Sequence, residues 1–170
     1  EMCIRDRYFI VGSPFEDEES LVETDKFLAA LRRESRRVRL SIHASVLIPK
    51  ASTPFQYLEL PERESVLECM RSLQRIAVKN GLNFKAKGFR SAARQAILSL
   101  GDERVGRAII LSSVEGVAWG VALRRVGFED SILYSRKDSA TSFPWDRFYD
   151  DREKESLYRR FKKVVEKYNG

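Results

Sequence analysis

An apolar run from Tyr8 to Val11 stops abruptly at Gly12 and Pro14, and a helix-like stretch begins after Glu16. Short apolar runs bounded by glycine and proline are typical of buried strands, especially those of parallel sheets. In α/β folds, ligands lie where such strands end and the chain turns toward its helix. The pattern therefore predicts a strand whose tip faces a ligand.

Helical and strand periodicities alternate through the rest of the first half. Leucines keep helical spacing as far as Arg33, and Pro61 and Gly81 bound a second helical stretch, as proline and glycine commonly do. Residues 82–86 alternate as a short strand. The clearest strand is residues 39–49, whose apolar positions are Leu40, Ile42, Ala44, Val46 and Ile48. The order strand–helix–strand–helix–strand, with crossovers long enough for parallel pairing, predicts an α/β fold.

The polar positions of strand 39–49 are the first candidates for a site. In a (β/α) barrel its apolar positions would face the surrounding helices, whereas His43 and Ser45 would face the lumen near the C-terminal end of the strand, where active sites lie. Two roles stay open for His43, a hydrogen-bonded interior residue or a substrate contact. Pro49 and Pro54 then make the following loop rigid.

From Gly88 onward the periodicity is helical. We expect residues 8–87 to form the α/β part and residues 88–170 a helical C-terminal extension. Within the extension, the helix at 103–113 is expected to turn Val105, Ile109 and Ile110 inward. Residues 127–151 are expected to be irregular, and the other predicted helices are residues 91–100, 117–126 and 153–168.

Composition narrows the class of protein. The 170 residues, 43% of them hydrophobic and 33% charged, are typical of a globular domain. No apolar run approaches the roughly 18 residues needed to span a bilayer, so a cytoplasmic protein with no membrane partner is expected. Two cysteines and one histidine are too few for a disulfide framework or a Cys-rich metal centre. The net charge of +6 permits an anionic partner, but the basic residues are scattered.

Residues 1–7 are expected to be foreign to the protein. The string Glu-Met-Cys-Ile-Arg-Asp-Arg is what the transposon-end adapter of sequencing libraries encodes in one reading frame. On this interpretation the chain is a fragment whose true N-terminus lies upstream, and Cys3 carries no information. The alternative is a genuine start at Met2.

Four stretches in sequence order give the chain a resemblance to the C-terminal part of radical S-adenosylmethionine (SAM) proteins. It is most similar to the branch that often carries a cobalamin-binding-type domain, and it is a more distant relative of the tRNA methylthiotransferases. Residues 9–17 resemble the family's Gly-Leu-Pro-Gly-Glu-Thr turn after the fifth barrel strand, with Phe15 and Asp17 as departures. Residues 45–56 resemble the Ser-x-x-Val-Pro-Lys-Pro-x-Thr-Pro-Phe segment at the sixth strand. The other two stretches are Leu98 to Gly106 and Phe143 to Asp146.

The resemblance implies a partial (β/α) barrel and a SAM site at its strand ends. The cofactor-binding residues it implies are Gly12, Ser13, Pro14, Glu16, Ser45, Leu47 and Pro49. Glu16 would accept hydrogen bonds from ribose hydroxyls or, alternatively, cap the adjacent helix. Because Phe15 replaces a glycine, the backbone shape of the turn is in question. Asp102 is expected to cap a helix after a break at Gly101 rather than to bind substrate.

The resemblance also implies a [4Fe–4S] cluster that this chain cannot hold. Family members use a Cys-x-x-x-Cys-x-x-Cys motif on the first barrel strand, and that motif is absent here. The expected partner is therefore the missing N-terminal part of the same polypeptide, and this chain alone is expected to be inactive. Cobalamin is a further cofactor of the branch, and the substrate, for which RNA is one candidate, is not specified by the sequence.

Two interpretations compete with an enzyme fragment. One is a complete cytoplasmic domain. The other is a non-enzymatic basic α/β module that binds RNA or DNA through Arg32, Arg33, Arg36, Arg37, Lys85, Lys87, Arg90 and Arg94.

Overall fold

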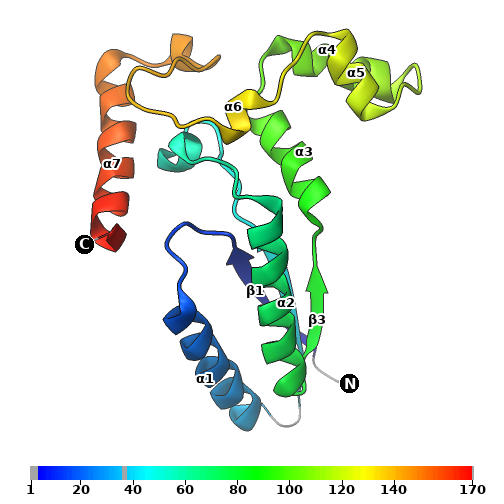
Figure 1. The fold of residues 1–170 in the computed structure, drawn as a ribbon, viewed down its shortest axis with the longest axis vertical. Helices are drawn as coiled ribbons and strands as arrows, with labels where there is room; N and C mark the ends of the chain where they lie inside the picture. The colour runs from blue at the N-terminus through cyan, green and yellow to red at the C-terminus, as the bar shows by residue number, and fades with distance from the viewer. Residues whose placement is uncertain (1–3, 36–37, 170) are drawn as a thin grey trace. The chain divides into compact units, whose positions relative to one another are not determined.

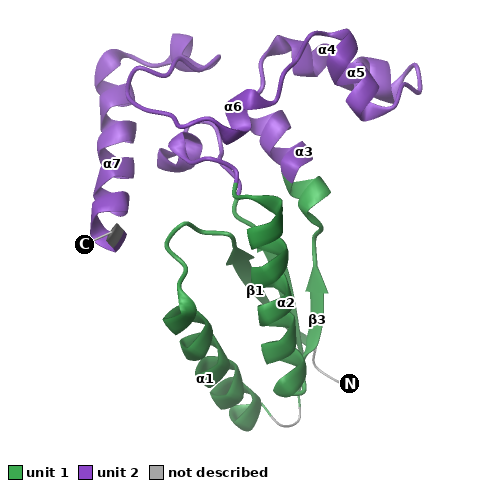
Figure 2. Ribbon diagram, in the orientation of Figure 1, with its two compact units in different colours: residues 1–47, 61–92 green, residues 48–60, 93–170 purple. Residues whose placement is uncertain are grey.

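The computed structural model describes residues 4–35 and 38–169, which form two compact units. Unit 1 comprises residues 1–47 and 61–92, and unit 2 comprises residues 48–60 and 93–170 (Figure 2). Cys3, Met2, Arg36 and Arg37 lie outside the described residues. Among the described residues, strands pair in the first unit alone, so the α/β class predicted from periodicity is confirmed there.

Unit 1 is a three-stranded parallel sheet in the order β1-β2-β3, with one helix in each crossover. Two helices, α1 and α2, lie side by side along the sheet (Figure 1). The Lys79 ammonium and the Asn80 side-chain amide, both from the C-terminal end of α2, donate to the Asp25 carboxylate of α1 at 2.5 and 2.8 Å. The elements are β1 (Ile4–Val11), α1 (Glu18–Glu34), β2 (Arg39–Val46), α2 (Arg63–Lys79) and β3 (Asn83–Ala86).

The two faces of the sheet differ in burial. On β2, every second side chain lies under the helices; these are Leu40, Ile42, Ala44 and Val46, each with at most 7% of its surface exposed. The intervening positions face the other way: on β2 Ser41 is itself only 6% exposed, whereas Tyr8 and Ile10 on β1 are 77% and 60% exposed. The described residues thus cover one face of the sheet and leave the other open around β1.

Local sequence signals define both helices of unit 1. Asp17 caps α1, because its carboxylate accepts from the backbone N–H of Ser20 at 2.8 Å. The backbone N–H of Asp17 in turn donates to the Ser20 hydroxyl at 3.5 Å, which completes a capping box. Helix α2 begins two residues after Pro61, and Gly81, with φ of +67°, follows its C-cap residue Asn80. The boundaries predicted from Pro61 and Gly81 are therefore correct to within two residues.

Unit 2 is made of helices and loops. Its elements are η1 (Pro54–Tyr57), α3 (Phe89–Leu100), whose first residues belong to unit 1, α4 (Glu103–Ser113), α5 (Trp119–Arg125), α6 (Ser131–Tyr134), η2 (Asp146–Phe148) and α7 (Asp151–Asn169). Helix α4 follows the predicted break at Gly101, and its N-cap is Asp102, whose carboxylate accepts from Arg104 N–H at 2.9 Å. The predicted capping role of Asp102 is confirmed.

The prediction that Ile109 and Ile110 turn inward is wrong. They are 43% and 58% exposed, whereas Val105 and Ala108 are 4% and 0% exposed. The inward face of α4 passes through positions 105 and 108; with 3.6 residues per turn, position 109 lies on the flank of this face and position 110 on the far side of the helix. The prediction chose positions 109 and 110 because their side chains are large and hydrophobic, but the small side chain of Ala108 is the one that is buried.

The core of unit 2 joins the 48–60 segment to the C-terminal helix. The ring of Tyr57 lies 5.6 Å from Phe143, 5.0 Å from Tyr158 and 5.6 Å from Phe161, measured between ring centroids. Beside it the Gln56 side chain is 1% exposed, and its Oε1 accepts from the indole N–H of Trp145 at 2.9 Å. The segment after β2 is thus part of the helical unit by its packing.

Helices long and apolar enough to cross a membrane are absent from the described ranges.

Candidate functional site

The turn between β1 and α1 depends on Gly12. This residue has φ of +81°, a region that side chains rarely occupy, and an added Cβ would lie 3.0 Å from Pro61 Cγ and 3.2 Å from Val66 Cγ2. Of the described non-glycine residues, only Ser52 has positive φ, so Phe15 fits the turn with ordinary backbone angles. The left-handed residue of this turn is therefore Gly12, and the phenylalanine causes no backbone strain.

Glu16 closes this turn. Its carboxylate accepts a hydrogen bond from the backbone N–H of Gly12 at 3.1 Å. Burial raises the pKa of Glu16, although hydrogen bonds from Gly12, Ser13 and the Cys69 thiol favour the ionised form. The cap of α1 is the next residue, Asp17, and the pKa of that carboxyl is lowered by its hydrogen bonds with Ser20. The helix-capping role considered for Glu16 thus belongs to its neighbour.

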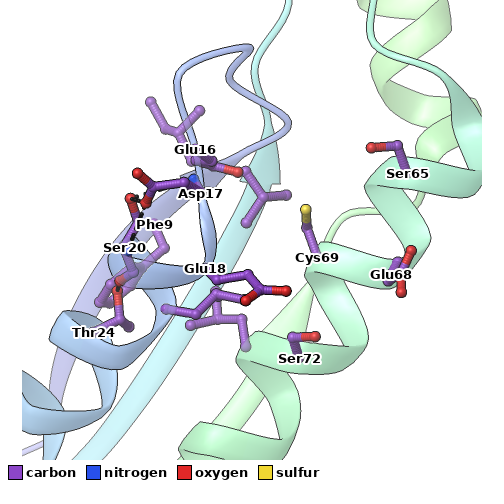
Figure 3. Close-up of a pocket in the computed structure, with 14 residues that line it drawn as sticks. Phe9, Glu16, Asp17, Glu18, Ser20, Thr24, Ser65, Glu68, Cys69 and Ser72 are labelled. Carbon is purple, nitrogen blue, oxygen red and sulfur yellow. Dashed lines mark hydrogen bonds between the residues drawn. The ribbon is translucent and has the colours of Figure 1, made fainter. Parts of the chain in front are cut away.

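A cavity of about 470 Å³ lies between α1 and α2, over β1 (Figure 3). Its polar lining is acidic and hydroxyl-rich, and the thiol of Cys69 projects into it from α2. Burial raises the pKa of that thiol, and the neighbouring carboxylates of Glu16 and Glu68 act in the same direction, so the neutral form is favoured. The lining residues include Glu16, Asp17, Glu18, Ser20, Thr24, Ser65, Glu68, Cys69 and Ser72.

The open face of the sheet carries a row of three side chains in register. Tyr8 on β1, His43 on β2 and Lys85 on β3 are successive partners across the parallel strands. The rings of Tyr8 and His43 are 5.3 Å apart between centroids, and His43 Nε2 lies 3.4 Å from an Asp6 carboxylate oxygen. His43 therefore lies on the face opposite the helices, as predicted from the alternation of strand 39–49.

The structure divides the residues expected at a cofactor site among three places. Gly12, Ser13, Pro14 and Glu16 form the β1–α1 turn, and the Glu16 carboxylate borders the cavity on the helical side of the sheet. Ser45 alternates with His43 on the open face, with its hydroxyl 3.5 Å from Phe9 O. Leu47 lies beside the turn, because its N–H donates to Val11 O at 2.8 Å. Pro49 is fully buried in unit 2.

Sequence reasoning missed the α2 side of the cavity. The thiol of Cys69 is half-buried and lies beside Glu16. No local signal pairs these residues, because their proximity depends on how α1 and α2 pack. Lys137, buried at 4% exposure, was missed for a similar reason: its ammonium donates at 2.9 Å to the carbonyl of Leu58, 79 residues away, and at 3.1 Å to the nearby carbonyl of Ser135.

The basic residues considered for nucleic-acid binding differ in their surroundings. The Arg32 guanidinium donates to the backbone carbonyl of Val38 at 3.1 Å and so ties α1 to the start of β2. Lys85, Lys87 and Arg90 are exposed in unit 1, and Arg94 is exposed in unit 2. Groups of three or more His, Cys, Asp or Glu side chains able to hold a metal ion do not occur in residues 4–35 and 38–169.

Comparison with known proteins gives one distant relative. The chain is 29% identical over 100 residues to an uncharacterized protein of Methanocaldococcus jannaschii, a match that covers 59% of this chain. The matched region is 22% of that protein, so the chain spans about a fifth of the length of the relative. No protein-family model matches the chain, and no solved structure matches it.

Proposed function

We propose that this chain is the C-terminal part of a radical SAM enzyme, with unit 1 forming three successive strands of its (β/α) barrel. The observation that carries the proposal is the sheet itself: three parallel strands in sequential order, with both crossover helices along one face. In a barrel every helix lies outside and the inner face turns toward the lumen, whereas doubly wound sheets have helices on both faces.

The open face and the sheet edges support the same proposal. Parallel sheets are normally covered on both sides, yet Tyr8 and Ile10 on β1 are 77% and 60% exposed. In the described part of the chain, β1 and β3 each have a partner only in β2. Further strands of the same polypeptide would pair with these edges and turn the open face inward.

The strand ends of unit 1 suit the binding of SAM. Gly12 brings the backbone close to Pro61, Glu16 fixes the turn through the Gly12 N–H, and Leu47 N–H joins the two strand ends. On this proposal the backbone of Gly12 to Pro14 and the side chain of Leu47 contact the cofactor. Glu16 acts by holding the turn, because its carboxylate is already bonded to the backbone.

The iron–sulfur cluster does not fit the described residues. Such a cluster needs three thiolates, and the one cysteine within the described ranges, Cys69, has a raised pKa and lies between carboxylates. On this proposal the cluster ligands belong to an upstream part of the polypeptide. In the complete enzyme the cluster would supply the electron that cleaves SAM.

The native gene provides the first test. We expect an in-frame Cys-x-x-x-Cys-x-x-Cys upstream of Tyr8, preceded or followed by strand–helix repeats that complete a barrel. A stop codon immediately before Met2 in a sequence free of adapter would overturn the proposal.

Binding of SAM to the full-length, cluster-loaded protein provides the second test. Glu16→Ala should weaken SAM binding measured by calorimetry, because the β1–α1 turn loses its closing hydrogen bond. The matched control is Glu23→Ala, which removes an exposed carboxylate on α1 that pairs with Lys26. Equal affinity of both variants and the wild type would exclude the turn from the SAM site. Tight binding of SAM by the 170-residue chain without iron would contradict the need for upstream residues.

A further inference from the structure

The open face of the sheet carries two lysines at the C-terminal end of β3. Lys85 lies in register with His43. The backbone N–H of Lys87 donates to Ala44 O at 3.0 Å, so the ladder continues by one residue, and alternation puts Lys87 on the same face as Lys85. Both side chains are exposed, and no ion pair in residues 4–35 and 38–169 involves either of them. The end of this face is therefore positively charged.

The adjacent strand adds uncharged and titratable donors to the same place. On β2 the His43 imidazole is the register partner of Lys85, and Ser45 is two residues nearer the strand end. The Ser45 hydroxyl is 3.5 Å from Phe9 O, the limit for a hydrogen bond, so it can turn to a better acceptor. The ring of Tyr8 lies beside the imidazole of His43, whose Nε2 is buried 3.4 Å from an Asp6 carboxylate oxygen and makes no hydrogen bond within the described residues.

We propose that His43, Ser45, Lys85 and Lys87 bind the phosphate or carboxylate group of a small-molecule substrate. Two ammonium groups, an imidazole and a hydroxyl are the donors that such an anion requires, and both groups share that need. The role of these four residues as a substrate site rests on the proposed barrel, in which the open face of the sheet lines the lumen. Tyr8, 77% exposed beside His43, provides a flat wall for the body of the substrate.

The compactness of the donor set favours a small molecule over a nucleic acid. The four residues occupy two neighbouring strands and span three positions along each. Nucleic-acid backbones are bound by rows of cations that follow successive phosphates. On β1, the strand next to His43, the open face presents Asp6, Tyr8 and Ile10, so the cationic donors do not extend across the sheet.

The single histidine of the sequence gives a direct test on the 170-residue chain. Inorganic phosphate and benzoate are titrated separately at constant ionic strength, and the NMR signals of the His43 imidazole are followed. We expect a saturable shift with phosphate, benzoate or both, and which of them binds more tightly identifies the anionic group. A shift that saturates with neither anion, or saturable binding of single-stranded RNA without binding of either small anion, would overturn the proposal.

Two double variants that remove the same charge distinguish a specific anion site from general electrostatic attraction of anions to a basic protein. The double variant Lys85→Gln with Lys87→Gln should bind the titrated anion about tenfold or more weakly, because two direct ammonium contacts are lost. Lys162→Gln with Lys163→Gln removes the same charge from exposed positions of α7 and should leave the affinity within about twofold, the effect of long-range charge alone. Equal losses in both pairs would overturn the proposal. The test needs neither SAM nor a cluster, so failure of anion binding leaves the SAM proposal to its own experiments.

Discussion

The backbone N–H of Gly12 donates to the Glu16 carboxylate at 3.1 Å, and this bond closes the turn that follows the first strand. The two residues depend on each other. The positive φ of Gly12 reverses the chain so that Glu16 can reach back across the turn. The next residue, Asp17, then starts α1 with a cap of its own.

Substituting Gly12 with alanine should destabilise unit 1. Alanine at this position would have to keep a left-handed backbone conformation, and its methyl group would meet Pro61 Cγ at 3.0 Å. We therefore expect a loss of about 1–3 kcal/mol in the free energy of unfolding. The matched control is Gly106→Ala in α4, where nothing lies within 4 Å and alanine should stabilise the helix by roughly 0.5–1 kcal/mol. Urea unfolding followed by circular dichroism measures both. Equal stability of Gly12→Ala and wild type would show that the turn tolerates a side chain.

Neutralising Glu16 and Asp17 should change stability with opposite dependence on pH. The pKa of Glu16 is raised in the folded state by burial, so its favourable contribution is present at low pH and is lost as pH rises through the folded pKa. Glu16→Gln should therefore gain stability relative to wild type as pH rises above the unfolded pKa of glutamate.

The pKa of Asp17 is lowered, chiefly by the Ser20 hydroxyl, so its contribution is present above its unfolded pKa and is lost as pH falls. Asp17→Asn should therefore be destabilised at neutral pH and approach the wild type in acid. Thermal unfolding measured across this pH range distinguishes the two trends. Parallel pH profiles for the two variants would contradict the assigned directions.

Local signals in the sequence were sufficient to predict the order of the elements of unit 1 and the helix-covered face of its central strand, but β1 begins at Ile4, inside the segment that was expected to be foreign. The alternation around His43 gave its orientation, because a parallel strand with helices on one side buries every second residue. The residues Pro61 and Gly81 gave the ends of α2 to within two positions, since both act through local backbone geometry.

Relations between distant segments could not be predicted from the sequence. The contact of Cys69 with Glu16 depends on the packing of α1 against α2, and the burial of Lys137 depends on a loop meeting the carbonyl of Leu58. Periodicity also failed where a small residue occupies the contact. Helix α4 packs through Ala108, whereas hydrophobicity alone favoured Ile110.

Alanine substitutions on α4 should therefore follow exposure rather than side-chain size. Val105→Ala removes methyl groups from a side chain that is 4% exposed and should cost about 1–3 kcal/mol. Ile110→Ala removes more atoms, but from a side chain that is 58% exposed, and should change stability by less than about 0.5 kcal/mol. Chemical denaturation of the two variants measures the difference. A larger loss for Ile110→Ala would mean that its face of α4 is covered in solution.

Lys137 should make stability rise with pH in the alkaline range. Burial lowers the pKa of this ammonium to about 8, so between about pH 8 and 10.5 the unfolded chain binds more protons than the folded one. Stability therefore increases across that range, by on the order of 2–3 kcal/mol from this group. Lys137→Met should not show this increase. Its stability at pH 7 can differ from the wild type, because the substitution removes the donor of the hydrogen bonds to the carbonyls of Leu58 and Ser135, but the pH dependence is the quantity that tests the prediction.

An exposed lysine provides the control for this pH dependence. Lys162→Met on α7 removes the same type of charge from a solvated position and should keep the rise seen in the wild type. Urea unfolding at pH 7.5, 9 and about 10.5, followed by tryptophan fluorescence, compares the wild type with Lys137→Met and Lys162→Met. Both tryptophans, Trp119 and Trp145, lie in unit 2. The same rise in Lys137→Met as in Lys162→Met would show that the ammonium of Lys137 is not the group that titrates.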